Sequence, residues 1–346
     1  MTLSRQTLAL GAAALVMTAL ALWAGLKENP ASRAAAGAGE ILVPGFAAQK
    51  DAVAKIVLSG PGNTVTLTRD GGIWRVGEKA GHPADGILAQ LLVSGFADAR
   101  KLEPRTADPA YLGRLGLGDG ARQLNLENET GETLAAVTMG DQFMSPSGLG
   151  IVTFVWDQTE ARAWTATGFP EISPDPAFWL DEDVLHLSQL RVKRVSVALA
   201  GTEPYAIGRP APESANFAPL QSLGATYRQE AVNALGFALT DVFLEDATPA
   251  GGDDLFHVAD AVYETFDGLT VTVSLFDREG IVWASFAAHH DPSVLDRPGT
   301  PAVLPDAPAD GAAEAANLNA LWRGKIFRLP LEQISAILKR RQDLVR

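Results

Sequence analysis

Apolar and polar residues alternate along residues 55–76, which is the pattern of half-buried β-strands. The apolar positions of three successive short strands are Ile56, Leu58, Val65, Leu67, Trp74 and Val76. Asp70-Gly71-Gly72 separates the second strand from the third, and glycine accepts the backbone angles that tight turns need. The pattern therefore predicts an antiparallel meander.

The period of the apolar positions changes to that of an amphipathic helix after Pro83, a residue that suits the first turn of a helix. One face of this predicted helix gathers Ile87, Leu88, Leu91, Leu92, Phe96 and Leu102. We expect the helix to lie against the meander, so that residues 55–102 form one α+β unit.

The order of strands and helix begins again near Arg191. Ile56 aligns with Val195, and Gly95 aligns with Ala238 at nearly the same separation. A separation that recurs along the chain is the mark of an internal repeat. The sequence therefore predicts two tandem α+β repeats, each an antiparallel sheet with a helix.

The second copy has its own helix signals. Thr226 and Gln229 fit a capping box at the start of a helix over residues 226–243. Its apolar face would contain Ala231, Val232, Leu235, Leu239, Val242 and Phe243. Strands with turns at Asp267-Gly268 and Glu279-Gly280 follow, as in the first copy.

Other segments complete the expected fold. Alternation and turn residues predict four strands within residues 122–167. Residues 291–313 are rich in Pro, Ala and Asp, which predicts a loop. A strand over residues 325–329 is followed by a helix that begins at Pro330, with an apolar face of Leu331, Ile334, Ile337, Leu338 and Leu344.

Residues 8–26 contain no charged side chain and are nearly all apolar, which is enough to cross a bilayer core of about 30 Å. A cleaved signal peptide has a shorter apolar core, so an uncleaved anchor is favoured over a signal peptide. We expect the amino terminus inside and the body exported. The predicted domains are an anchor, a spacer with lead-in, and the two repeats, over residues 1–27, 28–50, 51–185 and 186–346.

The formal net charge of −13 argues against a nucleic-acid partner, because phosphate binding requires a basic surface. The absence of cysteine excludes disulfides, thiolate metal sites and cysteine nucleophiles. Motifs for phosphate-binding loops, serine nucleophile elbows and zinc proteases are also missing from the sequence.

Several segments in a fixed order resemble the bacterial domain-of-unknown-function 4340 family. They are IVLSGPGNTVTLTRDGGIWRV, HPADGILAQLLVSG, YLGRLGLGD, ARAWTATG, PDPAFWLDEDVL and GKIFRLPLEQISAILKRRQDLV, which together extend over residues 50–346. The resemblance implies a membrane-anchored extracytoplasmic protein at the bacterial inner membrane. It also implies association with ABC-type transport components and similarity to gliding-motility auxiliary proteins, and it brings no catalytic residues.

Three groups of residues are candidates for chemistry, each with a simpler structural explanation. His289-His290-Asp291, with help from His257 or Asp260, offers metal ligands, but adjacent strand residues point to opposite faces. Asp181-Glu182-Asp183 offers carboxylates, although its position after Phe178-Trp179-Leu180 also fits a helix start or a turn. A sugar-stacking platform or core packing would account for Trp74, Trp156, Trp164, Trp179 and Trp283.

The sequence thus favours a single-pass accessory or interaction protein of an ABC-type transport system, with its body in the periplasm. We expect no catalytic activity, no cofactor and no metal, and we assign no catalytic, cofactor-binding or metal-binding residue. The expected partners are the inner membrane, through residues 8–26, and a permease, ATPase or auxiliary protein. Exposed sheet edges are the expected docking surface. The alternatives are a glycan-binding module of the envelope and an envelope hydrolase.

Overall fold

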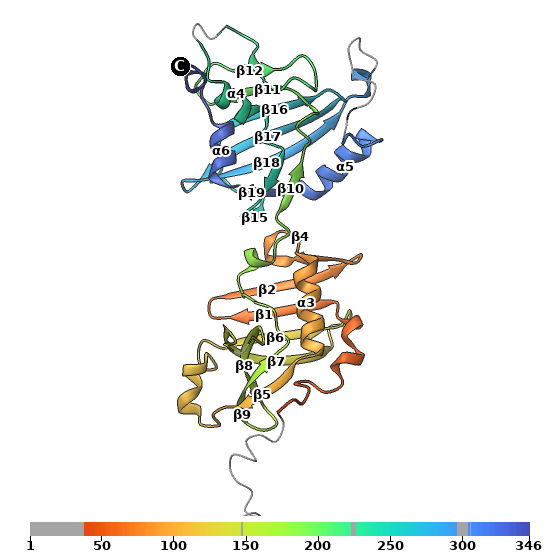
Figure 1. The fold of residues 1–346 in the computed structure, drawn as a ribbon, viewed down its shortest axis with the longest axis vertical. Helices are drawn as coiled ribbons and strands as arrows, with labels where there is room; N and C mark the ends of the chain where they lie inside the picture. The colour runs from red at the N-terminus through yellow and green to blue at the C-terminus, as the bar shows by residue number, and fades with distance from the viewer. Residues whose placement is uncertain (1–37, 147, 223–225, 296–303, 305) are drawn as a thin grey trace, which may run out of the picture. The chain divides into compact units, whose positions relative to one another are not determined.

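The computed structural model describes residues 38–146, 148–222, 226–295, 304 and 306–346 (Figure 1). The described chain is mostly antiparallel sheet with few helices, and its strands form two large sheets. This confirms the α+β prediction at that level. The predicted anchor, residues 8–26, lies outside the described residues, and none of the helices that are described is long and apolar enough to cross a membrane.

The first large sheet has nine strands. In spatial order they are β4 (His82–Pro83), β3 (Ile73–Val76), β2 (Asn63–Asp70), β1 (Lys55–Gly60), β6 (Arg122–Glu127), β7 (Thr133–Met144), β8 (Ile151–Asp157), β9 (Arg162–Thr167) and β5 (Arg100–Pro104). The predicted alternation is confirmed, because all six apolar positions of the first meander are buried. Ile56 and Leu58 lie opposite Leu126 and Leu124 of the neighbouring strand.

The second large sheet has eight strands. Their order is β13 (Ala218–Pro219), β12 (Tyr205–Gly208), β11 (Val192–Leu199), β16 (Phe256–Thr265), β17 (Leu269–Arg278), β18 (Ile281–His290), β19 (Lys325–Arg328) and β15 (Asp246–Pro249). A separate ribbon of two strands pairs β10 (Asp183–His186) with β14 (Asp241–Phe243).

The two large sheets have the same strand order once β4 is set aside. The order β3-β2-β1-β6-β7-β8-β9-β5 in the first corresponds strand by strand to β13-β12-β11-β16-β17-β18-β19-β15 in the second. Each sheet also has a helix at the matching place along the chain. In the first sheet α3 (Gly86–Ala97) lies between β3 and the edge strand β5, and in the second α4 (Gln229–Gly236) lies between β13 and the edge strand β15. Every strand of the first sheet precedes residue 185, and every strand of the second follows it.

Contacts between Cα atoms divide the chain into two compact units. Of the described residues, one unit contains those of 38–64 and Gln90–Pro174, and the other contains those of Val65–Ala89 and Asp175–Arg346. In the first unit, Phe96 of α3 packs edge-on against Phe46 and Phe169, with ring centroids 5.1 and 5.5 Å away. These rings are buried and form part of the core of that unit.

In the second unit, α5 (Gly311–Trp322) runs beside β18 (Figure 1). Asn319 of this helix bonds to both backbone groups of Ala288, at 2.9 and 2.7 Å. Strand β19 pairs only with the first part of β18, so α5 covers the edge that β19 leaves. Trp322 donates a hydrogen bond of 3.0 Å to the carbonyl of Val184.

The helix predicted over residues 226–243 is shorter than expected. Tyr227 is extended and bridges Val345, so the N-cap is Arg228 and the proposed capping box at Thr226 is wrong. The helix ends at Gly236, against which the ring of Phe217 packs too closely for any side chain. The last residues of the predicted helix instead form β14.

Other helix boundaries also differ from the prediction. Pro83 lies in β4, which pairs with β3, and α3 begins only at Gly86. The helix turns Ala89, Leu92 and Phe96 to the core, which leaves Ile87 and Leu91 exposed instead of buried. At the other end of the chain, α6 (Leu331–Ile337) stops before a separate 3₁₀ turn that buries Leu344. Within the predicted loop 291–313, Pro292–Val294 form a 3₁₀ turn and Gly311 begins α5, which Asp310 caps through the amide of Ala313.

Candidate functional site

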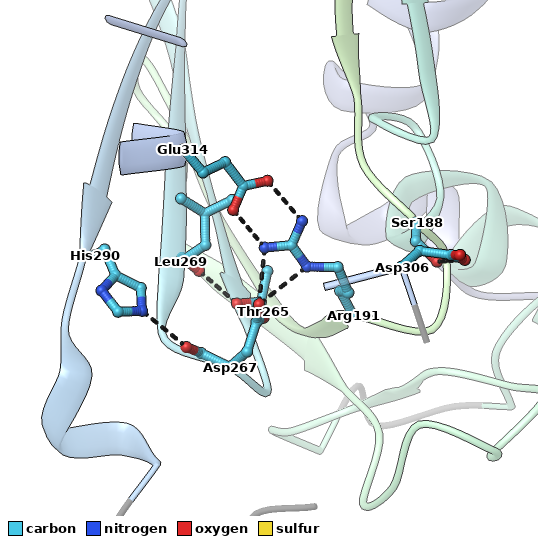
Figure 2. A network of polar contacts seen from close by, with 8 residues as sticks. All are labelled: Ser188, Arg191, Thr265, Asp267, Leu269, His290, Asp306 and Glu314. Carbon is cyan, nitrogen blue, oxygen red and sulfur yellow. Dashed lines mark hydrogen bonds and ion pairs between the residues drawn. The ribbon is translucent and has the colours of Figure 1, made fainter. Parts of the chain in front are cut away.

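Figure 2 shows a network of polar contacts that centres on the buried Arg191, just before β11. Its guanidinium donates to Asp267 Oδ2 from Nε and Nη2, at 3.1 and 2.8 Å. It also donates to both carboxylate oxygens of Glu314, each at 2.7 Å. Arg191 therefore joins the β16–β17 turn to the first turns of α5.

The carboxylates of Glu314 and Asp267 keep the buried Arg191 charged. Burial alone would lower the pKa of Arg191, but the hydrogen bonds and charges of Glu314 and Asp267 raise it above its usual value. Four guanidinium hydrogen bonds go to protein carboxylates, which leaves little capacity for a ligand. A buried charged group of this kind fixes the positions of its partners, and we interpret the network as structural.

A cavity of about 590 Å³ lies beside the network, and its walls include Asp267, His290 and Gly311. A ring nitrogen of His290 lies 3.1 Å from the backbone oxygen of Asp267 (Figure 2). The side-chain oxygen Oδ1 of Asp267 has no hydrogen-bond partner among the described residues, but it is shielded from solvent. This oxygen of Asp267 is therefore not available to a substrate as an acid or base.

The candidate metal ligands do not converge. His289 is exposed, whereas the ring of His290 turns to the Asp267 backbone. His257 forms its own pair with Asp260, at 3.1 Å. Within the part of the chain that the structure describes, no three His, Asp or Glu side chains are grouped so as to hold a metal ion.

The tryptophans do not form an exposed platform. Among the described residues, Trp156 is partly exposed, and the buried ones are Trp74, Trp164, Trp179, Trp283 and Trp322. Buried indole rings pack in the core and cannot stack on a sugar. The core-packing alternative is therefore the correct one for the four buried tryptophans that the sequence proposed as a platform.

Two stretches of sheet edge are covered by other parts of the chain. Beside β5, the amide of Lys101 donates to Glu40 at 3.0 Å, and the amide of Leu42 donates to Ala99 at 2.7 Å. The edge of β18 is covered by α5, as described above. These edges are thus poor templates for a strand from another chain.

A different surface is assembled around the segment 178–183. On one side its backbone pairs with residues 83–85: Ala84 bridges Leu180, and the amide of Asp85 donates to Trp179 at 2.8 Å. Further along, Asp183 pairs with Phe243 of β14. The segment thereby places side chains from α3, from β14 and from its own residues around one groove.

This groove, the acidic groove below, has a volume of about 630 Å³ and is lined by Asp85, Gly86, Ile87, Phe178, Leu180, Asp181, Glu182, Asp183 and Phe243. Three of its apolar side chains are exposed: Ile87 by 76%, Phe243 by 44% and Phe178 by 37%. Its lining, all of it within the described chain, contains four carboxylates and neither Lys nor Arg.

Asp181 connects the groove to the core. Burial raises its pKa, and the charges of Asp183 and Asp85 raise it further, against a backbone hydrogen bond from Asp183. The carbonyl of Asp181 lies 2.9 Å from Nε2 of His82, a fully buried side chain whose ring also contacts Phe327. Asp183 begins β10, so of the two structures predicted for this acidic run, a helix start or a turn, the helix start is wrong. Sequence patterns gave no signal for the groove beyond the run of acids.

Comparison with known proteins adds no relative: no family model, no curated protein and no solved structure matches this chain.

Removal of the Arg191 charge should destabilise the fold. Arg191→Met leaves Asp267 and Glu314 without their cation, and loss of one partner of a buried pair costs about 3–5 kcal/mol of unfolding free energy. Arg194→Met, in the adjoining strand β11, breaks only an exposed pair with Glu264, which is worth about 0–1 kcal/mol. Urea unfolding measures both variants, and equal losses would contradict the structural role of Arg191.

His82 should make stability depend on pH. Burial, with smaller contributions from the charges of Lys325 and Arg75, lowers its pKa to about 4, although its bond to Asp181 opposes this shift. The unfolded chain takes up a proton near pH 6.5, whereas the folded chain does so only near pH 4. The stability contribution is therefore complete above pH 6.5 and is lost as the pH falls towards 4.

The comparison variant is His82→Gln, which keeps a donor for the Asp181 carbonyl but does not titrate in this range. Between about pH 7.5 and pH 4.5, wild type should lose about 2–3 kcal/mol more unfolding free energy than the variant. Parallel pH profiles of the two proteins in urea unfolding would show that His82 is not the titrating group.

Proposed function

We propose that this chain is a membrane-anchored, extracytoplasmic accessory protein that works by binding another protein, an ABC-type transport component. The observation that carries the proposal is the acidic groove, where Ile87, Phe178 and Phe243 are exposed together. Exposed apolar surface with a polar rim is typical of protein-binding sites. The uncharged apolar run at residues 8–26 supports the anchor, and the family resemblance supports the partner and the location at the bacterial inner membrane.

We further propose that the body consists of two tandem repeats. The identical strand order of the two large sheets supports this interpretation, as does the matching place of α3 and α4 along the chain. The two copies differ in the segment that follows the helix. In the second copy, β14 is inserted after the helix, and it contributes Phe243 to the acidic groove.

Binding of a glycan or hydrolysis of an envelope polymer is less well supported. The buried tryptophans offer no stacking platform, and the described residues contain no group of three His, Asp or Glu side chains that could hold a hydrolytic metal ion. The accessory role is therefore the proposal to test first.

The test is co-purification from membranes solubilised in mild detergent, with the full-length chain carrying a C-terminal tag. We expect mass spectrometry to identify a permease or ATPase subunit of an ABC-type system. A version limited to residues 40–346, checked for folding by circular dichroism, should lose most of this partner, because the anchor keeps both proteins in one membrane. Reproducible recovery of the full-length protein alone would contradict the accessory role.

A further inference from the structure

The acidic groove combines exposed apolar side chains with charge of a single sign. We propose that it binds a partner polypeptide segment whose apolar side chains are flanked by Lys or Arg. This inference rests on the proposed function, because it identifies the surface by which the accessory protein would hold its partner.

The apolar part of the groove has the features of a binding site. Leu180 and Trp179 are buried beneath it, and Phe178 packs edge-on against Trp179 with ring centroids 5.5 Å apart. Phe178 and Phe243 thus offer aromatic surface that water covers in the free chain. Aromatic side chains in such positions contribute much of the binding energy at protein interfaces.

The backbone around the groove is held in place before any partner binds. The amide of Asp181 donates to Pro83 at 3.0 Å, and the amide of Leu244 donates to Glu182 at 2.9 Å. Asp85 caps α3 by accepting from the amides of Ile87 and Leu88, at 2.9 and 3.0 Å. A surface that is ordered in advance loses less entropy on binding.

The charges select the partner. Asp85, Asp181, Glu182 and Asp183 line the groove, and no Lys or Arg of the described chain is among its lining residues. The nearest histidine on the ribbon, His186, is engaged with Asp241 at 2.6 Å, and the buried His82 is neutral at neutral pH because its pKa is about 4. A basic segment would meet opposite charge here, whereas an acidic one would be repelled.

A metal ion is a poorer occupant than a basic polypeptide. Oδ1 of Asp85 already accepts the helix cap, and Oδ1 of Asp181 accepts from the amide of Asp183 at 3.2 Å. Across the described residues, these carboxylates do not gather into a metal-binding group. A metal also leaves the exposed aromatic rings without a role.

The test uses the full-length chain in phosphatidylcholine nanodiscs and a fluorescent peptide of Leu and Lys, about 14 residues long, with Leu at helical spacing. Fluorescence anisotropy measures its dissociation constant, with empty nanodiscs as the baseline. A matched peptide with Glu in place of Lys should bind at least about tenfold more weakly, because the rim repels it.

Three substitutions neutralise the rim without changing its shape: Asp181→Asn, Glu182→Gln and Asp183→Asn. Together they should weaken binding of the Lys peptide by about tenfold, or about 1.4 kcal/mol. The matched control removes three exposed carboxylates elsewhere, by Asp119→Asn, Glu129→Gln and Asp253→Asn, and should change binding less than about twofold. Equal losses in the two triple variants would show non-specific attraction to an acidic protein and would overturn the proposal.

The apolar contribution has its own pair of variants. Phe243→Ser should weaken binding several-fold, whereas Phe256→Ser, at a phenylalanine that is 67% exposed outside the groove, should not. Ile87→Ser, at the most exposed apolar position of the groove, gives a second measurement if Phe243→Ser lowers the thermal unfolding midpoint. Unchanged binding in both groove variants would overturn the apolar part of the proposal.

Co-purification with the same variants separates this inference from the proposed function. Loss of the transport subunit with the rim variant, but not with its control, supports the groove as the docking site. Recovery of that subunit with both triple variants overturns the groove while the accessory role stands. Groove-dependent peptide binding in a chain that co-purifies with no transport subunit supports the groove and contradicts the proposed partner.

Discussion

The backbone pairing of the segment 178–186 is the constraint on which the functional surface depends. Residues 179–181 bond to residues 83–85, and residues 182–186 bond to β14 and the residue after it. One extended stretch therefore joins two other parts of the chain that are far from it in sequence. These bonds use backbone groups, which must be paired when they are buried. The side chains of the segment divide between core and surface, because Trp179 and Leu180 are buried whereas Phe178 is exposed. Phe243 and Ile87 line the same groove and are exposed as well.

The buried charges have a different task. The guanidinium of Arg191 donates hydrogen bonds to Asp267 and Glu314, and these bonds use most of its donors within the protein. The result is a fixed junction between β11, the β16–β17 turn and α5. The acidic groove has the opposite character, because its carboxylates lie at the surface without a basic side chain in the lining. Carboxylates thus stabilise the fold around Arg191, whereas in the acidic groove they form the proposed recognition surface.

The sequence predicted those features that depend on local patterns. Alternation placed Ile56, Leu58, Val65 and Leu67 correctly in the core, and the restart at Arg191 corresponds to the second large sheet. Local patterns failed where a distant segment competes. Thr226 did not cap a helix because Tyr227 pairs with Val345. Ile87 is exposed because α3 turns Ala89, Leu92 and Phe96 to the core instead.

The acidic groove was beyond the reach of sequence reasoning, because its lining comes from three separate segments. The run Asp181-Glu182-Asp183 resembles the start of a helix, and only the pairing of Asp183 with Phe243 shows that it borders an apolar surface. The Arg191 network was missed for a similar reason, since Arg191, Asp267 and Glu314 are widely spaced and no motif connects them.

The most direct test of the account is photo-crosslinking in intact membranes, with benzoylphenylalanine replacing Phe243 in the groove or Phe256 outside it. Both positions already carry an exposed aromatic ring, so neither replacement should disturb the fold. The account predicts a discrete crosslink from position 243 to a transport subunit, identified by mass spectrometry, and none from position 256. Crosslinks to the same subunit from both positions, or from neither, would contradict the claim that the acidic groove is the docking surface.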